Sequence, residues 1–304
     1  MDEGELQGNR TDFATLVCPY FPFRHNMQEG FPLITGRKLN IKPIAVELEG
    51  FLHGITSKKW YKDRGCNLWN EWANPLAVDS WMSYLTCDTA GYWNADKTEW
   101  KYTEQLPDRK EIAKKLDDLG PIYGYQWVRF NNVYDENDDG CVTIYNQVAD
   151  VIEKLKNNPT DRRMICMAWN PVQTSRMALP PCAIDWTVVP INGTLHMGFH
   201  MRSSDVGRGL PSDIASHAIL MKLLCKAANM KEGYLSGMLD NCHIYVNQVE
   251  PLQKLLEREP KPLPQLEIKD NIDGGFDVFK WTHADLVLDN YIPHPHIDMG
   301  QIAV

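Results

Sequence analysis

The spacing of apolar residues predicts three helices. In residues 41–54, IKPIAVELEGFLHG, apolar side chains recur at helical intervals and form one face, which is typical of an amphipathic helix. Residues 142–159, VTIYNQVADVIEKLKNNP, show a similar period and end at a proline, which predicts a second amphipathic helix. The stretch SDIASHAILMKLLCKAANMKEG predicts a longer, mostly buried helix with Ser212 as its N-cap.

Short apolar runs between these helices predict strands. They are RRMICMAW, DWTVVPI, TLHMGFHMR and GMLDNCHIYVN, and the proline-rich YIPHPHIDMGQIAV is also strand-like. This mixture predicts an α/β fold, and we expect one domain over residues 1–304 around a large sheet. Residues 74–118 are rich in Asp, Lys and Trp without a clear period, so we expect a surface insertion there.

Charge and composition exclude several classes of protein. The net charge is −9 and the pI is about 5.5, so no global positive field recruits nucleic acid and any phosphate must be held by local arginines. No apolar run approaches the roughly 20 residues that span a bilayer. The acidic start, MDEGELQGNR, is unlike a signal peptide. We therefore expect a cytoplasmic protein that contacts neither membrane nor nucleic acid.

One of the eight cysteines stands apart. No cysteine pair has C-x-x-C or zinc-finger spacing, so we expect no metal, and most thiols should be small buried hydrophobes. In MALPPCAIDW, however, Pro180 and Pro181 precede Cys182. Because proline fixes its own φ and restricts the residue before it, the thiol should sit on a stiff bend. Such a mount favours a nucleophile.

Several arginines are candidates for a phosphate site. Arg162 and Arg163 precede a predicted strand, Arg202 precedes Ser203, and Arg10 lies in GNRTD. Guanidinium groups prefer phosphate, and serine adds a hydroxyl donor. Neighbours in a strand point to opposite faces, so the adjacent pair can reach one phosphate only at a strand end or a subunit edge. The alternative is ordinary surface charge.

These stretches together resemble the thymidylate synthase and pyrimidine hydroxymethylase family. The nucleophile motif L-P-P-C-H appears as LPPCAID, and R-S-x-D-x-x-x-G-x-P-x-N-I-A appears as RSSDVGRGLPSDIA. The D-x-H-x-Y strand appears as NCHIYVNQ. GFPLITGRK, LWNEWA, LGPIYGYQW, DRRMICMAWN and the ending YIPHPHIDMGQIAV are also similar to family segments. The resemblance extends from about Arg10 to Val304.

The resemblance implies a large mixed sheet flanked by helices and a homodimer joined sheet to sheet with shared active sites. It implies a reaction in which methylenetetrahydrofolate supplies a one-carbon unit to C5 of a pyrimidine nucleoside monophosphate. Cys182 would attack C6 of the base. Glu47 would organise water and proton transfers, and Tyr123 would help remove the C5 proton.

The remaining implied roles concern binding. The phosphate would be held by Arg10, Arg202 and Ser203 together with Arg162 and Arg163 contributed across the dimer. The sugar 3′-hydroxyl would bond His243 and Tyr245. The folate would be lined or covered by Trp69, Asp205, Gly209 and Val304.

Elementary chemistry agrees with the central role of the thiol. C5 of a pyrimidine is a poor nucleophile until a thiolate adds at C6. A thiol is only a few per cent ionised at pH 7, and nearby arginines favour the anion. Taken singly, Glu47 could be a surface acid, Tyr123 a packing residue and His243 a core histidine.

Four positions depart from the synthase pattern. Ala183 replaces the histidine after the cysteine, Thr187 replaces a glutamine, and Asn241 replaces an aspartate. The base-reading asparagine is Asp213, preceded by Ser212 instead of an aromatic residue.

The aspartate predicts a cytosine substrate. A carboxylate accepts from the cytosine 4-amino group, and a protonated carboxyl can donate to N3. An ionised Asp213 would face uracil O4 with negative charge. Phage deoxycytidylate hydroxymethylases share the aspartate and lack the histidine. The alternative role for Asp213 is a favourable charge at a helix N-terminus.

We therefore expect dCMP hydroxymethylation, with water trapping the exocyclic methylene. This implies a phage enzyme of DNA modification in the host cytoplasm. The alternatives are a dCMP methylase, a dUMP-using thymidylate synthase, and an inactive nucleotide- or RNA-binding module.

Overall fold

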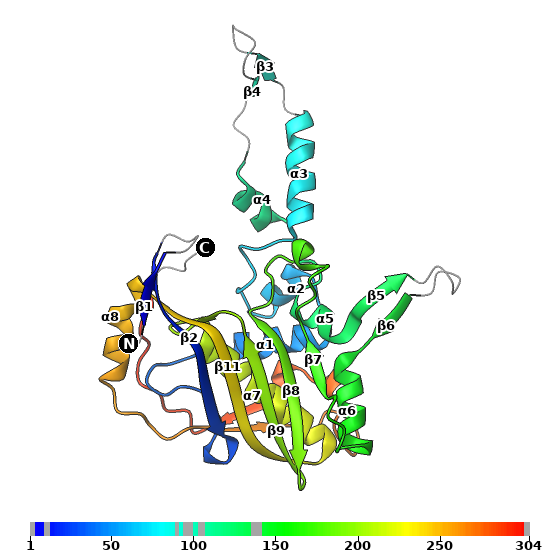
Figure 1. Cartoon of the computed structure of the whole chain (residues 1–304), viewed down its shortest axis with the longest axis vertical. Coiled ribbons are helices and arrows are strands. Elements are labelled where there is room, and N and C mark those ends of the chain that lie inside the picture. Colours follow the sequence, from blue (N-terminus) through cyan, green and yellow to red (C-terminus); the bar gives the residue numbers. More distant parts are fainter. Residues whose placement is uncertain are drawn as a thin grey trace.

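The chain folds around a seven-stranded mixed sheet. The computed structural model describes residues 4–8, 13–88, 91–93, 100–102, 107–134 and 142–300. The strand order is β1-β2-β11-β9-β8-β7, with β10 beside β11 (Figure 1). The strands β9 and β10 run parallel to β11, whereas the other neighbours are antiparallel. The bounds are β1 Glu5–Gln7, β2 Thr15–Asn26, β7 Ile165–Met167, β8 Ala183–Ile191, β9 Thr194–Met201, β10 Ser204–Asp205 and β11 Lys231–Tyr245.

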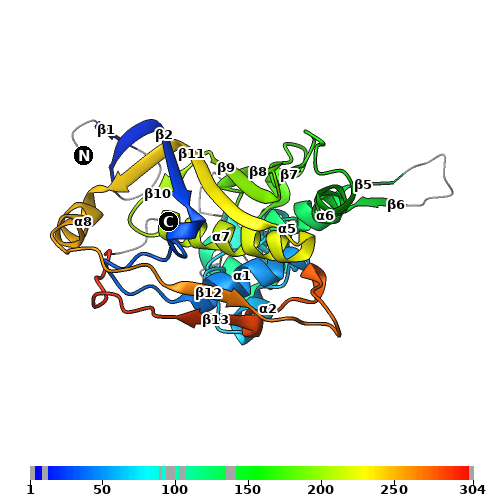
Figure 2. The same ribbon diagram turned by 90° about the horizontal axis from the view of Figure 1, so that it is seen from below.

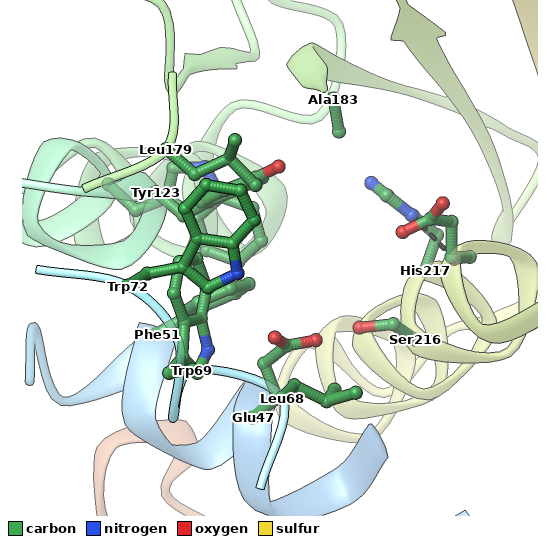
Figure 3. Close-up of a pocket in the computed structure, with 12 residues that line it drawn as sticks. Glu47, Phe51, Leu68, Trp69, Trp72, Tyr123, Leu179, Ala183, Ser216 and His217 are labelled. Carbon is green, nitrogen blue, oxygen red and sulfur yellow. Dashed lines mark hydrogen bonds between the residues drawn. The ribbon is translucent and has the colours of Figure 1, made fainter. Parts of the chain in front are cut away.

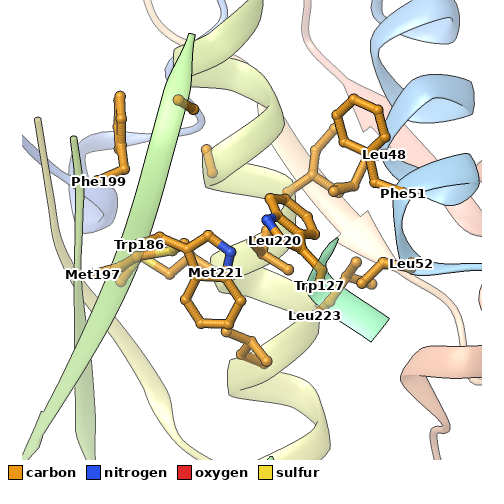
Figure 4. Close-up of a cluster of buried hydrophobic side chains, with 14 of the residues drawn as sticks. Leu48, Phe51, Leu52, Trp127, Trp186, Met197, Phe199, Leu220, Met221 and Leu223 are labelled. Atoms are coloured by element: carbon orange, nitrogen blue, oxygen red, sulfur yellow. The ribbon is translucent and has the colours of Figure 1, made fainter. Parts of the chain in front are cut away.

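Helices cover one face of this sheet. The long helix α7 (Gly209–Ala228) lies against it with α1 (Ile41–Leu52), and a small ribbon of β12 (Gln265–Ile268) and β13 (Leu286–Asp289) lies beyond them (Figure 2). Leu220, Met221 and Leu223 of α7 are fully buried. Among them Trp127 and Trp186 meet edge to face with centroids 5.9 Å apart (Figure 4). The mixed α/β fold predicted from the sequence is confirmed.

Shorter elements complete the molecule. The helices are α2 Lys58–Asp63, α3 Pro75–Asp88, α4 Arg109–Lys115, α5 Tyr123–Arg129, α6 Gln147–Asn157 and α8 Val249–Leu256. The strands are β3 Gly91–Trp93, β4 Trp100–Tyr102, β5 Phe130–Tyr134 and β6 Val142–Tyr145. Single 3₁₀ turns occupy Met27–Glu29, Thr174–Arg176, Val246–Gln248, Val278–Lys280 and His283–Asp285.

Within residues 74–118, the described elements α3, β3, β4 and α4 form an arm that projects from the body (Figure 1). Its helices α3 and α4 pack around a small cluster of their own, formed by Ala73, Val78 and Ile112. At its base, the buried ammonium of Lys58 donates to four backbone carbonyls, at 2.7–3.2 Å. The interpretation of this segment as an insertion in one domain stays a prediction.

Three predicted elements differ in the structure. Residues 142–159 are not one helix, because β6 comes first and α6 begins after Asn146, whose side chain accepts the Ala149 N–H at 2.9 Å. The helix α7 begins at Gly209 and not after Ser212. The proline-rich tail is not a strand over residues 291–300, since proline lacks the N–H that a ladder needs.

Candidate active site

The predicted nucleophile lies on a clamped turn. Cys182 directly precedes β8, and the Arg202 guanidinium donates to the carbonyls of Pro180 and Pro181, each at 2.8 Å. The Arg202 backbone N–H donates to the Cys182 carbonyl at 2.9 Å. The Tyr123 hydroxyl accepts the Cys182 N–H at 2.7 Å. The prolines thus define the bend, and Arg202 and Tyr123 hold it in place.

A cavity of about 150 Å³ opens beside this turn. It brings together Glu47 from α1, Tyr123 from α5 and Asp213 from α7, so three predicted catalytic residues from distant parts of the chain share one pocket (Figure 3). Cys182 lies at the edge of the cavity. The next residue, Ala183, lines the cavity, and the lining residue Tyr123 accepts the Cys182 backbone N–H. The other lining residues are Phe51, Leu68, Trp69, Trp72, Trp127, Leu179, Ser216 and His217.

Burial dominates the chemistry of the two carboxyl groups. It raises the pKa of Glu47 to about 8, helped by the nearby Asp213 carboxyl and opposed by the Trp69 indole. It raises the pKa of Asp213 to about 7, with Asp205 adding to the effect. Both groups can therefore carry or release a proton near neutral pH, as general acid–base catalysis requires.

The thiol is not activated in the free site. Burial raises the pKa of Cys182, and Asp213 adds to the rise, while Arg202 and the Tyr123 hydrogen bond oppose it. Burial and the Asp213 carboxyl therefore outweigh the help that neighbouring arginines were expected to give the thiolate, although Arg202 does lower the pKa of Cys182. Burial also raises the pKa of Tyr123, which keeps its phenol neutral and able to donate.

The predicted sugar-binding pair lies on β11. The His243 Nδ1 donates to the Asn241 carbonyl at 3.0 Å, which leaves Nε2 as an acceptor. The ring meets Tyr245 edge to face at 5.2 Å. His243 is also the register partner of Asp205 on β10. The strand β10 begins directly after Ser203, so Ser203 lies near this pair. The roles of these residues and Ser203 in binding sugar and phosphate stay predictions.

Other predicted binding residues lie apart from the cavity. Arg162 and Arg163 line a separate surface hollow with Asn158, Thr160 and Asp161, and the Arg163 side chain is 87% exposed. Arg10 and Val304 lie outside the described residues.

Two of the residues predicted to bind folate have structural contacts. The Asp205 carboxylate accepts from the N–H groups of Gly207 and Arg208 at 2.9 and 3.2 Å and from the Gln248 amide at 3.1 Å. It therefore organises the turn that leads into α7. Gly209 begins α7 close to Asp213, since a Cβ added at Gly209 would lie 3.5 Å from the Asp213 Oδ2. Their contact with folate stays a prediction.

Sequence reasoning missed several lining residues. Trp72 and Leu179 lie in the family-like stretches LWNEWA and LPPCAID, but nothing in those stretches marked them as lining residues. His217 does carry a local signal, because it follows Asp213 by four residues on one helix, and residues at that spacing share a face. Ser216 lies beside it.

Two classes of feature are absent from the part of the chain that the structure describes. No group of three or more His, Cys, Asp or Glu side chains there is arranged to hold a metal ion. No helix there is long and apolar enough to cross a membrane.

Comparison with known proteins agrees with the geometry. The family model for thymidylate synthase matches residues 1–304. The chain is 36% identical over 304 residues to a bifunctional dihydrofolate reductase-thymidylate synthase of Paramecium tetraurelia, covering 98% of this chain and 58% of that protein's length. It is 33% identical over 305 residues to a thymidylate synthase of Mesoplasma florum, covering 100% of this chain and 96% of that one. The chain therefore belongs to the thymidylate synthase family, whose members use methylenetetrahydrofolate as co-substrate for one-carbon transfer to C5 of a pyrimidine nucleotide.

Proposed function

We propose that this protein transfers a one-carbon unit from methylenetetrahydrofolate to C5 of dCMP, with 5-hydroxymethyl-dCMP as the product. The observation that carries the proposal is the Asp213 carboxyl, which lines the pocket where the family pattern has an amide. Its pKa of about 7, raised by burial, lets it carry a proton at neutral pH.

A carboxyl group that carries a proton suits cytosine chemistry. Thiolate addition at C6 pushes electron density onto C5 and N3 of the ring. Asp213 can give its proton to N3 and accept from the 4-amino group. In uracil N3 already carries a hydrogen, so the charge develops on O4, where an ionised carboxylate is repulsive.

The other pocket residues carry out the remaining steps of the proposed reaction. Cys182 forms the bond to C6, and the enamine carbon C5 then attacks the one-carbon unit supplied by the folate. Tyr123 and Glu47 both line the pocket and can relay the C5 proton. The ionised form of Glu47, which a pKa of about 8 leaves partly populated near neutral pH, accepts the proton, and the neutral Tyr123 phenol can pass it on. Loss of the C5 proton would expel tetrahydrofolate as the leaving amine and give an exocyclic methylene on the base. Water then adds its oxygen to that methylene, its proton passes to the acid–base groups of the pocket, and C6 releases the Cys182 thiolate. The aromatic wall of Trp69 and Trp72 fits the flat ring system of a folate (Figure 3).

A dUMP-using thymidylate synthase is the second candidate. The relatives described above bear that name, and a protonated Asp213 can also donate to O4 and accept from the uracil N3–H. Reductive methylation of dCMP is a further outcome, because a dry aromatic pocket protects a hydride transfer. An inactive binding module would have no use for a mounted thiol beside two acids with raised pKa values.

The decisive experiment is mass analysis of the product. The protein is given methylenetetrahydrofolate with dCMP and dUMP in competition. A mass gain corresponding to a hydroxymethyl group on dCMP supports the proposal, a methyl group on dCMP selects the methylase, and a product from dUMP alone overturns the cytosine assignment.

Asp213→Asn gives a second arm of the test. We expect kcat/KM for dCMP to fall at least about 10-fold, the effect of about 1.4 kcal/mol in the transition state. Turnover of dUMP should rise. Asp63→Asn removes an exposed carboxylate that pairs with Lys59, and this control should leave both rates unchanged.

A further inference from the structure

We propose that His217 is a second reader of the base, and that its Nε2 accepts a hydrogen bond from the 4-amino group of cytosine while Asp213 accepts the other. This assigns a specificity-determining residue and rests on the proposed function.

The hydrogen bonds of His217 fix its tautomer. His217 Nδ1 lies 2.7 Å from the Asp213 carbonyl oxygen, one turn earlier in α7. A carbonyl oxygen can only accept, so Nδ1 carries the hydrogen and Nε2 presents a lone pair. The ring also stacks on Phe199, with centroids 4.1 Å apart and planes 11° from parallel. Two independent contacts therefore hold the ring in one orientation.

The lone pair is left for a ligand. The His217 side chain is only 5% exposed and lines the pocket. Among the described residues, its Nε2 has no hydrogen-bond partner. In Figure 3 the ring extends from α7 into the space toward Ala183. Because Ala183 has only a methyl group, that space stays open. A buried polar atom without a partner is costly, and a bound base would satisfy it.

The imidazole stays neutral in this position. Burial lowers the pKa of His217 to about 4, although its bond to the Asp213 carbonyl opposes the fall. Nε2 is thus an acceptor throughout the physiological range.

Two acceptors on one side of the base discriminate by chemistry. The 4-amino group of cytosine has two hydrogens and can satisfy both Asp213 and His217. The O4 atom of uracil is itself an acceptor, so it would face the His217 lone pair without a proton between them. The arrangement selects a 4-amino pyrimidine.

His217→Phe tests this role. Phenylalanine keeps the ring and its stacking on Phe199 but removes the lone pair. We expect the ratio of kcat/KM for dCMP over dUMP to fall at least about 10-fold. His217→Gln, whose amide oxygen can accept again, should recover part of the ratio. As a control, His196→Phe changes a histidine that stacks on Tyr234 and does not line the pocket, and the ratio should not change.

A substrate analogue tests the same contact without any variant. N4-methyl-dCMP keeps only one amino hydrogen, so the parent protein should bind it at least about 10-fold more weakly than dCMP. In His217→Ala the lost ring leaves room for the methyl group, and the difference between the two nucleotides should shrink.

The outcomes separate the two proposals. A parent protein that prefers dUMP overturns the proposed function and the inference with it. A parent that prefers dCMP, together with an unchanged ratio in folded His217→Phe, overturns the role of His217 alone. Equal binding of dCMP and N4-methyl-dCMP by the parent overturns it as well, even where the variants fail to fold.

Discussion

At the scale of single residues, burial controls the titratable groups of the pocket more than charge does. Burial is the largest cause of the raised pKa values of Glu47, Asp213 and Cys182. The Asp213 carboxyl adds to the cost of ionising Glu47, and Asp205 adds to the cost of ionising Asp213. Because these pKa values are raised, the two carboxyl groups and the thiol tend to stay protonated in the free protein.

The raised pKa of Asp213 predicts a stability effect with a definite sign. The folded state binds this proton up to about pH 7, whereas the unfolded carboxyl, with its ordinary value of 3.8, has already released it. The free energy of unfolding therefore falls as pH rises between these values. Asp213→Asn removes the penalty, so relative to the parent it should gain on the order of 1–3 kcal/mol between about pH 4 and about pH 8.

Urea unfolding at the two pH values measures this difference. Asp63→Asn, at an exposed position, is the control and should differ from the parent by the same amount at both. A difference between Asp213→Asn and the parent that does not change with pH would show that Asp213 ionises freely in the folded protein.

Replacement of the nucleophile has a direct expectation. Cys182→Ala should abolish exchange of the C5 hydrogen of the nucleotide with solvent, because no thiolate adds at C6. Nucleotide binding should persist, since Cys182 only borders the pocket. Cys225→Ala, which removes a buried thiol whose charged neighbours are Glu232 and Lys222 and not the pocket acids, is the matched control and should still exchange. Exchange at the parent rate in Cys182→Ala would remove the thiol from the mechanism.

At the scale of elements, the sequence predicted interiors better than ends. The helix in residues 41–54, the strands β7, β8, β9 and β11 and the long helix α7 all follow from apolar patterns. Their boundaries depend on contacts that no local pattern reveals. Asp205, which lies before α7, organises the turn that starts the helix. In residues 142–145, the β-branched run pairs with β5 instead of extending α6.

For the candidate site, the sequence likewise identified the main residues but not how their side chains are oriented. Cys182, Glu47, Tyr123 and Asp213 could be chosen from motifs, and the fold brings the last three into one cavity. The orientation of Arg202 toward the proline carbonyls could not be chosen, because it depends on packing between β9 and the nucleophile turn. The raised pKa of the thiol was not foreseen either, because its largest cause is burial, which depends on tertiary packing.

The corrected start of α7 has a measurable consequence. Ser212 lies within the first turn and caps nothing, so Ser212→Ala should change the free energy of unfolding by less than about 0.5 kcal/mol. Asn146 caps α6 through the Ala149 N–H, and Asn146→Ala should cost about 1 kcal/mol. Denaturant unfolding of both variants tests the assignment. A loss of unfolding free energy in Ser212→Ala as large as that in Asn146→Ala would show that Ser212 is the N-cap of α7.

At the scale of the whole molecule, the sheet has one face covered by helices and one that is not (Figure 2). Apolar side chains point outward from the uncovered face, with exposures of 38–54% for Met167, Ile165, Met238 and Val189. Large exposed apolar patches mark interaction surfaces. This supports the proposed sheet-to-sheet homodimer, in which a second copy would cover the face.

The expected homodimer would give Arg162 and Arg163 a use that one chain does not. Both line a hollow separate from the pocket near Cys182. In a two-fold dimer the same patch meets its copy, and we expect each arginine pair to reach the phosphate site of the other subunit. Arginine pairs of this kind favour bidentate phosphate binding. Arg163 forms only a 3.7 Å contact with Asp161 and leaves most of its side chain exposed.

Mixed dimers test this arrangement. Cys182→Ala and Arg163→Ala should each be inactive alone, the first for lack of a nucleophile and the second for lack of a phosphate ligand. After subunit exchange, a hybrid dimer contains one doubly altered site and one intact site. Random exchange of equal amounts makes about half the dimers hybrids, so activity should return to about a quarter of the parental level. Separable affinity tags on the two chains verify the exchange. Verified hybrids that remain inactive would show that Arg163 does not act across the dimer, and an Arg163→Ala protein that is active alone would place Arg163 outside the active site.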